Sequence, residues 1–276
     1  MALSRTDVFR ASRAFIAAAG LTSLAAQAPA IASDLPPRRA TMAAPDETAG
    51  DAWKFQITGY GWASGIDGKV GVAGLPPSGV HVPFSKLLSH LDGGLMGAFY
   101  ATNGTWSVLS DLMWAKLSAK TNLNDFPRTS VEATQRQLTA SGFVGYRLPV
   151  GNSDLDLSAI AGVRYNRLTL DLTVQPGFLP LTFSRTWVKS WADPVVGLTA
   201  RYKINNSWFL SGLADVGGFG AGSRLTAQGL AAVGYNWSAS WSSSLGYRVL
   251  YTDYSSNGFV YNVTQHGPFV TLAYRF

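Results

Sequence analysis

The stretch that decides the fold is the last one, HGPFVTLAYRF, residues 266–276. Its side chains alternate between two rows. The apolar row consists of Phe276, Tyr274, Leu272, Val270 and Pro268. The other row is small, polar or charged apart from one aromatic residue, and consists of Arg275, Ala273, Thr271, Phe269 and Gly267. A period of two is that of a β-strand whose two faces meet different environments. We expect the apolar face to meet lipid and the mixed face to line the inside of a barrel.

Composition agrees with a membrane β-barrel. Charged residues make up 14% of the 276 residues, against roughly 25% in an average soluble domain. Beyond the amino terminus, no apolar run reaches the roughly 18 residues that a transmembrane helix needs. In a barrel strand apolar and polar side chains alternate, so the sequence contains no long apolar run although one face is apolar. The sequence contains 0 cysteines, which excludes disulfides, thiolate zinc sites and cysteine nucleophiles. The formal net charge is +6, but the basic residues are scattered, which argues against a nucleic-acid partner.

The amino terminus has the pattern of an export signal. A basic segment precedes a short apolar run, and Ala30, Ile31 and Ala32 supply a small-x-small cleavage pattern. A retained helical anchor is the alternative, but the run is short and polar residues interrupt it. We therefore expect a signal peptide at 1–32, a flexible periplasmic lead-in at 33–52 and an outer-membrane β-barrel at 53–276.

Alternating segments recur from Trp53 onward, and their connections alternate in length. Short turns are expected at Asn103 and Gly104 and at the sequences PVGNS, NNS and WSA. Long loops are expected at 68–90, 119–130, 173–183, 217–223 and 255–261. Ten strands result, with both termini on the short-turn, periplasmic side, as in outer-membrane barrels. A shift of phase near Gly59 predicts a β-bulge in the first strand.

Aromatic residues form two predicted girdles. The girdle near the short turns contains Trp53, Trp106, Tyr146, Tyr202, Trp208, Tyr235, Trp241, Tyr274 and Phe276. The girdle near the long loops contains Trp62, Trp114, Tyr165, Trp187 and Tyr251. A soluble β-sandwich would also alternate, but it has no reason to band aromatics at both ends of its strands.

The leader, the Ala/Pro-rich lead-in, the girdles and the terminal Leu272, Tyr274 and Phe276 together resemble small, porin-like outer-membrane β-barrel proteins of Gram-negative bacteria. The DLPPRR start is similar to that of alphaproteobacterial outer-membrane immunogenic proteins. This resemblance implies that the terminal aromatic strand is an assembly signal read by the barrel assembly machinery. It also implies a monomer in outer-membrane lipid, with basic loop residues in DFPRT and LTFSR touching lipopolysaccharide phosphates.

Charged residues are predicted on the inward rows. They are Arg147, Arg164, Arg201, Arg248, Arg275, Asp111, Asp156, Asp193 and Asp215. Opposite charges in a narrow interior should pair, because an unpaired buried charge is expensive. Two interpretations stay open: a charge network that plugs and stiffens the barrel, and a positive constriction that favours anions. Ten strands lie near the barrel size that side chains fill.

The first long loop contains a candidate gate. In PFSKLLSHL, the apolar residues Phe84, Leu87, Leu88 and Leu91 fall at helical spacing. The short helix that they predict could fold over the barrel mouth, or it could pack on the rim or on lipid.

An enzyme is not expected, and neither a cofactor nor a metal. Omptins are barrel proteases that resemble this architecture and carry an acidic pair and an Asp-His pair, but this chain has 3 histidines and no Asp-His dipeptide. The sequence therefore predicts a non-enzymatic outer-membrane barrel with a structural or surface-interaction role. The alternative is a narrow, anion-leaning channel for small solutes.

Overall fold

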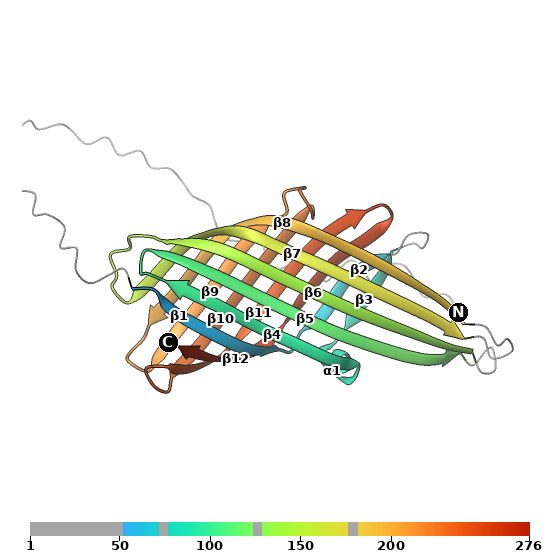
Figure 1. The fold of residues 1–276 in the computed structure, drawn as a ribbon, viewed down its shortest axis with the longest axis horizontal. Helices are drawn as coiled ribbons and strands as arrows, with labels where there is room; N and C mark the ends of the chain where they lie inside the picture. Colours follow the sequence, from blue (N-terminus) through green and yellow to red (C-terminus); the bar gives the residue numbers. More distant parts are fainter. Residues whose placement is uncertain (1–51, 72–76, 124–128, 176–181) are drawn as a thin grey trace, which may run out of the picture. The chain divides into compact units, whose positions relative to one another are not determined.

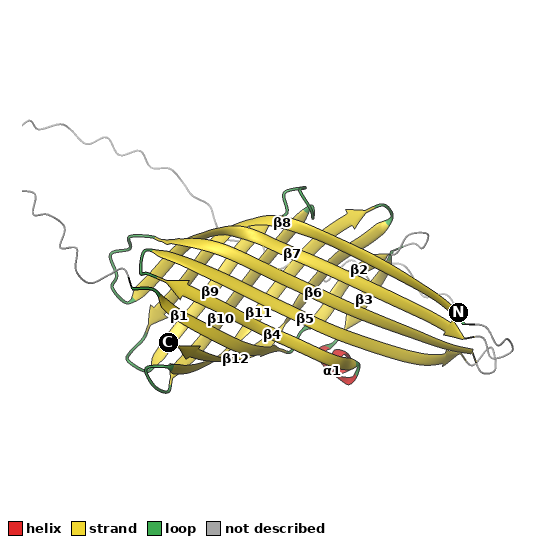
Figure 2. Cartoon of the chain, viewed as in Figure 1, coloured by secondary structure: helices red, strands yellow, loops and turns green. Residues whose placement is uncertain are grey.

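Alternating rows of apolar and mixed side chains produce long β-strands along almost the whole described chain (Figure 2). The computed structural model describes residues 52–71, 77–123, 129–175 and 182–276. Within them lies one short helix, α1 (Phe84–Ser89). In the part of the chain that the structure describes, no helix is both long and apolar enough to cross a membrane.

The strands follow one another in chain order. They are β1 (Lys54–Trp62), β2 (Gly65–Gly71), β3 (Ser78–Val82), β4 (Leu91–Thr102), β5 (Trp106–Leu123), β6 (Thr129–Arg147), β7 (Leu155–Gln175), β8 (Phe183–Lys203), β9 (Trp208–Gly217), β10 (Leu225–Asn236), β11 (Trp241–Ser256) and β12 (Phe259–Arg275).

Neighbouring strands pair antiparallel from β4 through β12, and β12 pairs back with β1, which closes the barrel (Figure 1). The 12 segments occupy 10 positions, because β1 and β2 lie end to end along β12, and β3 and β4 share the next position. An all-β antiparallel barrel of 10 strands, the fold class predicted from the sequence, is confirmed.

The predicted bulge near Gly59 is wrong. The ladder between β1 and β12 runs without a shift from Gln56 to Trp62, and β2 continues it in the same register from Gly65. The break between β1 and β2 lies opposite Pro268, which has no N–H to donate to a ladder. The carbonyl of Pro268 still accepts from the N–H of Ala63, at 2.9 Å.

The ladder between β1 and β4 covers less than the full height of the barrel. It runs from Lys54 to Gly59 on β1. Above it, β1 stays paired with β12 and β4 stays paired with β5, while β3 pairs with β2. Helix α1 connects β3 to β4, so the chain leaves the sheet after β3 and rejoins it at the start of β4. Within the described residues, β4 has no ladder partner on its β1 side from Leu91 to Met96.

The two rows of the terminal strand point as predicted. On β12, Val270 and Leu272 are 56% and 53% exposed, whereas Phe269 and Ala273 are buried. The same division holds on β10, where Val233 is exposed and Ala232 is buried. A closed ring of strands with a continuous apolar outer row is the architecture of an outer-membrane β-barrel.

Three short turns share one motif: Asn or Ser, any residue, Ser or Thr, and Trp. They are residues 103–106 (NGTW), 205–208 (NNSW) and 238–241 (SASW). In each, the first side-chain oxygen accepts hydrogen bonds from the N–H groups of the third and fourth residues, at 2.8–3.3 Å. The side chain thereby substitutes for a backbone turn bond.

Each of these tryptophans then packs on the tyrosine directly opposite it in the next strand. The cross-strand pairs are Trp106 with Tyr146, Trp208 with Tyr235, and Trp241 with Tyr274. Their ring centroids lie 4.9–5.0 Å apart in tilted or edge-on arrangements. The girdle at the short-turn end is therefore a repeated Trp–Tyr unit, and the turn motif sets its position.

The second predicted girdle is partly wrong. Trp114, Tyr165 and Tyr251 lie on outward rows. Trp62 is buried inside the barrel, where its indole Nε1 donates to the carbonyl of Gly267 at 3.1 Å. Trp187 shares the inward row of Trp191. Side chains alternate strictly between the two faces of a strand that has no bulge, and this alternation turns Trp62 and Trp187 inward.

The loops predicted at 119–130, 173–183 and 255–261 are shorter than expected, whereas the loop predicted at 217–223 lies between β9 and β10. Strands β5 to β8 contain 18, 19, 21 and 21 residues, against the about 9–11 that span a bilayer. These strands therefore extend beyond the part that spans the membrane. In the extensions, polar residues stand on both faces, so the outward row is no longer apolar. The connection between β11 and β12 is a two-residue hairpin turn, with Asn257 and Gly258 at φ 49° and 76°, the signs that a type I′ turn requires.

We predict that Asn205→Ala lowers the free energy of unfolding by about 1 kcal/mol, because two turn hydrogen bonds are lost where water replaces them in part. The measurement is urea unfolding of the barrel refolded into lipid vesicles, followed by tryptophan fluorescence. Asn206→Ala is the matched control in the same turn, since its side chain accepts neither bond. Equal losses in both variants would contradict the role of Asn205.

Candidate functional site

The candidate site is the inner face of the barrel. The charged residues predicted for it all lie on inward rows, and they are Asp111 on β5, Arg147 on β6, Asp156 and Arg164 on β7, Asp193 and Arg201 on β8, Asp215 on β9, Arg248 on β11 and Arg275 on β12. The structure places six of them in three ion pairs.

Arg164 forms the most deeply buried pair. Its Nη2 donates to Asp215 Oδ2 at 2.7 Å, and both side chains are 0% exposed. The other two nitrogens of the guanidinium also donate: Nε donates to Ser141 at 3.3 Å, and Nη1 donates to Thr226 at 3.1 Å. Asp215 compensates the buried charge, and three of the five N–H groups of the guanidinium donate to protein acceptors.

Arg248 forms a second buried group. Its Nη2 donates to Asp111 Oδ2 and to Gln228 Oε1, both at 2.7 Å, and its Nη1 lies 3.1 Å from the Tyr60 hydroxyl. Tyr60 in turn donates to Asp111 Oδ1 at 2.6 Å. Side chains of β1, β5, β10 and β11 thus meet across the lumen in one network.

The remaining arginines lie at the short-turn end. Arg147 pairs with Asp156 at the rim, where both side chains are about half exposed. Arg275 donates to Gln56 at 3.0 Å and to Asn236 at 3.2 Å. The guanidinium of Arg201 lies over the ring of Phe209, 3.5 Å from its centroid. Within the described residues, neither Arg201 nor Arg275 forms an ion pair, so this end of the lumen carries excess positive charge.

Asp193 is buried without an arginine partner in the described residues. It lies directly opposite Arg164 in the ladder between β7 and β8, yet the guanidinium turns to Asp215. Its Oδ1 instead accepts the backbone N–H of Ser223 at 2.6 Å, which fixes the loop between β9 and β10.

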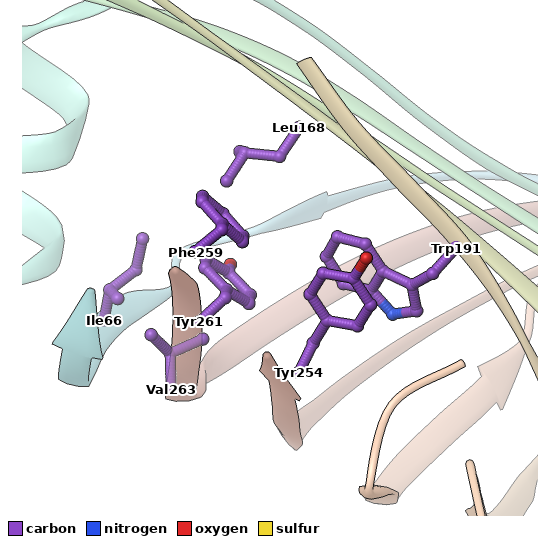
Figure 3. Close-up of a cluster of buried hydrophobic side chains, with 7 residues drawn as sticks. All are labelled: Ile66, Leu168, Trp191, Tyr254, Phe259, Tyr261 and Val263. Atoms are coloured by element: carbon purple, nitrogen blue, oxygen red, sulfur yellow. The ribbon is translucent and has the colours of Figure 1, made fainter. Parts of the chain in front are cut away.

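An aromatic cluster lies inside the barrel, farther from the short turns than the buried ion pairs (Figure 3). Its buried members are Ile66, Leu168, Trp191, Tyr254, Phe259, Tyr261 and Val263. The rings of Trp191 on β8 and Tyr254 on β11 stack at 4.1 Å with an interplanar angle of 9°. Sequence reasoning missed this cluster, because its members alternate with polar residues and come from five strands that only the closed ring brings together.

The candidate gate residues differ in their exposure. Helix α1 is present, and Leu87 packs against the aromatic cluster. Phe84 and Leu91 are exposed, and the side chain of Leu88 lies outside the described residues. The packing of Leu87 ties the helix to the barrel interior.

A second polar cluster lies on the outward face. The carboxylate of Asp67 on β2 pairs with His81 on β3, and it accepts from His266 Nε2 on β12 at 2.9 Å. The other nitrogen of His266, Nδ1, lies 2.7 Å from the Tyr247 hydroxyl. In the neutral imidazole that donates through Nε2, Nδ1 accepts from the tyrosine. The chain of hydrogen bonds can hold or pass a proton along the barrel surface.

No local signal could have revealed this outward cluster. Asp67 lies 14 residues from His81 and 199 residues from His266. The cluster therefore does not appear as a neighbouring Asp and His in the sequence. Only the strand register unites the three. In the part of the chain that the structure describes, no group of His, Asp and Glu side chains has the arrangement of a metal site.

Comparisons with known proteins add solved structures of similar fold. No protein-family model matches the sequence, and no curated protein matches it. The outer membrane protease OmpT from Escherichia coli is 11% identical, covers 82% of this chain and 96% of its own, and superposes with a TM-score of 0.45. The translocator domain of the autotransporter NalP from Neisseria meningitidis is 11% identical over 84% and 90%, with a TM-score of 0.41. The attachment invasion locus protein Ail of Yersinia pestis is 10% identical over 81% and 98%, with a TM-score of 0.36. At these identities and scores, none of them indicates what this chain does.

We predict that Arg164→Met destabilises the barrel by about 3–5 kcal/mol, because it leaves Asp215 charged and buried without its partner. The double variant Arg164→Met, Asp215→Leu should recover most of this loss, because neither charge remains. Urea unfolding in lipid vesicles measures both.

Arg147→Met is the control at an exposed ion pair, and its expected cost is below about 1 kcal/mol. An Arg164→Met variant as stable as the Arg147→Met control would show that the buried pair contributes nothing to the stability of the barrel.

Proposed function

We propose that this protein is a non-enzymatic outer-membrane barrel with a structural or surface-interaction role. One observation carries the proposal: side chains from opposite walls meet across the lumen at successive levels. Arg248 of β11 reaches Asp111 of β5. Gln137 of β6 and Gln265 of β12 hydrogen-bond each other at 3.1 and 3.4 Å. Such cross-links stiffen a barrel and oppose the passage of solutes.

The small space beside the aromatic cluster supports the same proposal. The cavity beside the aromatic cluster measures about 10 Å³, near the lower limit for one water molecule at about 10–15 Å³. A solute would have to displace buried ion pairs and stacked rings to pass. A filled interior agrees with a barrel of 10 strands.

The absence of catalysis remains part of the proposal. The outward cluster of Asp67, His81 and His266 is the arrangement closest to acid–base chemistry. Its carboxylate, both nitrogens of His266 and Nδ1 of His81 already take part in hydrogen bonds within the cluster or with Tyr247. We propose that it fixes β3 to β2 and β12 at the barrel surface.

We propose that both termini face the periplasm. The start of β1 and the end of β12 lie together, since Phe55 and Phe276 exchange backbone hydrogen bonds at 3.1 and 3.2 Å. The short turns lie at the same end, and outer-membrane barrels keep short turns on the periplasmic side. The long extensions of β5 to β8 would then project outside.

Partners follow from this orientation. We propose outer-membrane lipid and lipopolysaccharide as the surroundings of a monomeric barrel. Basic side chains support lipopolysaccharide, because Arg136 on β6 and Arg167 on β7 lie on outward rows beyond the girdle residues Trp114 and Tyr165. The barrel assembly machinery is the proposed partner during insertion.

The second candidate function is a narrow, anion-leaning channel. It is favoured by Arg201 and Arg275, which line the short-turn end without forming ion pairs in the described residues. Excess positive charge at a constriction attracts anions.

Single-channel conductance of the refolded protein in a planar bilayer decides between the two functions. We predict a silent barrel, because the lumen is crossed by side chains. Discrete openings with anion preference under a salt gradient, weakened by Arg201→Ala, would favour the channel instead. Folding is checked on the same sample by its resistance to unfolding in cold detergent.

We further predict that the double variant Tyr274→Ala, Phe276→Ala lowers the amount of folded barrel in the outer membrane severalfold. Phe276 stacks on Phe55 at 5.8 Å and on Tyr274 at 6.1 Å, so the change removes both the closing contact and the proposed assembly signal. Quantitative blotting of heat-modifiable barrel in outer-membrane fractions measures it.

The matched control is Trp106→Ala, Tyr146→Ala, which removes an aromatic pair from the same girdle but not from the terminal strand. Equal losses in both double variants would assign the effect to the girdle and would reject a special role for the terminus.

A further inference from the structure

A groove lies on the outward face of the barrel, over the ladder that joins β1 to β12. Its volume is about 480 Å³, within the range of about 300–1,000 Å³ that is typical of sites for small molecules. The side chains around it are Ile57 of β1, Trp241 of β11, and Val270, Leu272 and Tyr274 of β12. Among the described residues that line it, none is charged.

Two glycines of β1 create the groove. Gly59 and Gly61 follow Ile57 on the outward row, and both line the groove. A Cβ atom at either position would meet no other part of the described chain within 4 Å. The residue opposite Gly59 in the ladder to β4 is a third glycine, Gly97. The outward surface is therefore hollow here because side chains are missing from neighbouring positions.

These glycines have no structural explanation within the described chain. Glycine in the interior of a strand weakens it, and such a glycine often marks a bulge or the close approach of another backbone or a ligand. The ladder from Gln56 to Trp62 has no bulge. Neither Gly59 nor Gly61 has a positive φ, and no other segment approaches them. A ligand that contacts the backbone is the explanation that agrees with an open groove.

The position of the groove defines the kind of ligand. Its side chains belong to outward rows, which an outer-membrane barrel turns toward lipid. Trp241 and Tyr274 lie at its short-turn end as one pair of the girdle, and such residues lie at the level of lipid head groups. An apolar groove that ends at this level matches a molecule with an apolar chain and a polar head.

A strand of a partner protein fits the groove less well. At the level of Gly59, β1 is paired with β12 on one side and with β4 on the other. At the same level, β12 is paired with β1 and with β11. The groove therefore offers no free backbone edge to an added strand.

We propose that the groove is a binding site for one lipid, with an acyl chain over Gly59 and Gly61 and the polar head beside Trp241 and Tyr274. The site rests on the proposed membrane surroundings of the barrel. It goes beyond them, because one lipid is held at a fixed place on the ladder that closes the barrel. The chain covers backbone that the missing side chains leave exposed.

Native mass spectrometry of the whole barrel tests the proposal. The protein is refolded into vesicles of phosphatidylethanolamine that contain free palmitic acid, and it is then released into detergent. The wild-type barrel should retain one lipid under activation that removes the others. The mass of the retained molecule distinguishes the phospholipid from the fatty acid, and either mass supports an acyl-chain site. In Gly59→Leu, Gly61→Leu the new side chains fill the groove, so the fraction of barrels with a retained lipid should fall severalfold.

The matched control is Gly142→Leu, Gly229→Leu. Both of these glycines also lie on outward rows with open space around the Cβ position, but neither lines the groove. The control should keep the lipid. Equal loss in the two double variants, or a wild-type barrel that retains no lipid, would overturn the site. A wild-type dimer that becomes monomeric in the groove variant would overturn it as well, because a second copy would then occupy the groove.

The proposed function is tested separately. Heat modifiability shows that each variant is folded, and conductance reports on the lumen, whereas the groove lies on the outward face. A barrel that conducts but retains the lipid would reject the proposed function and keep the site.

Fluorescence quenching locates the bound chain. Phosphatidylethanolamine with brominated acyl chains is added to the barrel in detergent, one lipid per barrel. Because Trp241 lines the groove, Trp241→Phe should lose most of the quenching that the wild type shows. Trp208→Phe is the control, since Trp208 has the equivalent place in the girdle and pairs with Tyr235. Undiminished quenching in Trp241→Phe would reject the placement of the chain.

Discussion

The hydrogen-bonded pairing of β12 with β1 is the contact on which the rest of the structure depends. A strand edge in hydrocarbon would leave backbone N–H and C=O groups without partners, so a sheet can cross a membrane only as a closed ring. Closure gives each residue one of two environments, lipid or lumen, and thereby enforces a period of two along every strand. It also brings the side chains of the inward rows into one narrow interior. Arginines, carboxylates and aromatic rings from different strands meet there.

Much of the fold could be predicted because its signals are local. The outward row of β12, the aromatic residues of the short-turn girdle and the short turns each show as a pattern over neighbouring positions, so a single sequence contains them. The errors arose where the signal was not local. Trp62 is predicted in the girdle near the long loops because it is aromatic and lies about ten residues after Trp53. The unbroken register turns it inward instead. The extents of β5 to β8 were underestimated, because strands outside the membrane have no apolar row to mark them.

The candidate site was predictable as a set of inward residues but not as a set of contacts. Alternation places Arg164 and Asp215 in the lumen, yet the register would pair Arg164 with Asp193, its direct neighbour across the ladder. A long side chain in a narrow lumen selects its partner by reach and desolvation, and strand order does not determine that choice. Asp67, His81 and His266 illustrate the same limit on the outer face. Each belongs to a different strand, and their meeting depends on the register of the closed ring.

The short ladder between β1 and β4 gives the barrel wall an uneven mechanical strength. Most neighbouring strands are joined along their full length, whereas β1 and β4 are joined over six residue pairs before they part around α1. Fluctuations that open a structure begin where the fewest hydrogen bonds must break. In this barrel one such place is the interval between the ladder of β1 with β4 and the ladder of β2 with β3. The wall should therefore yield first at this interval, beside α1, and not along a whole strand edge.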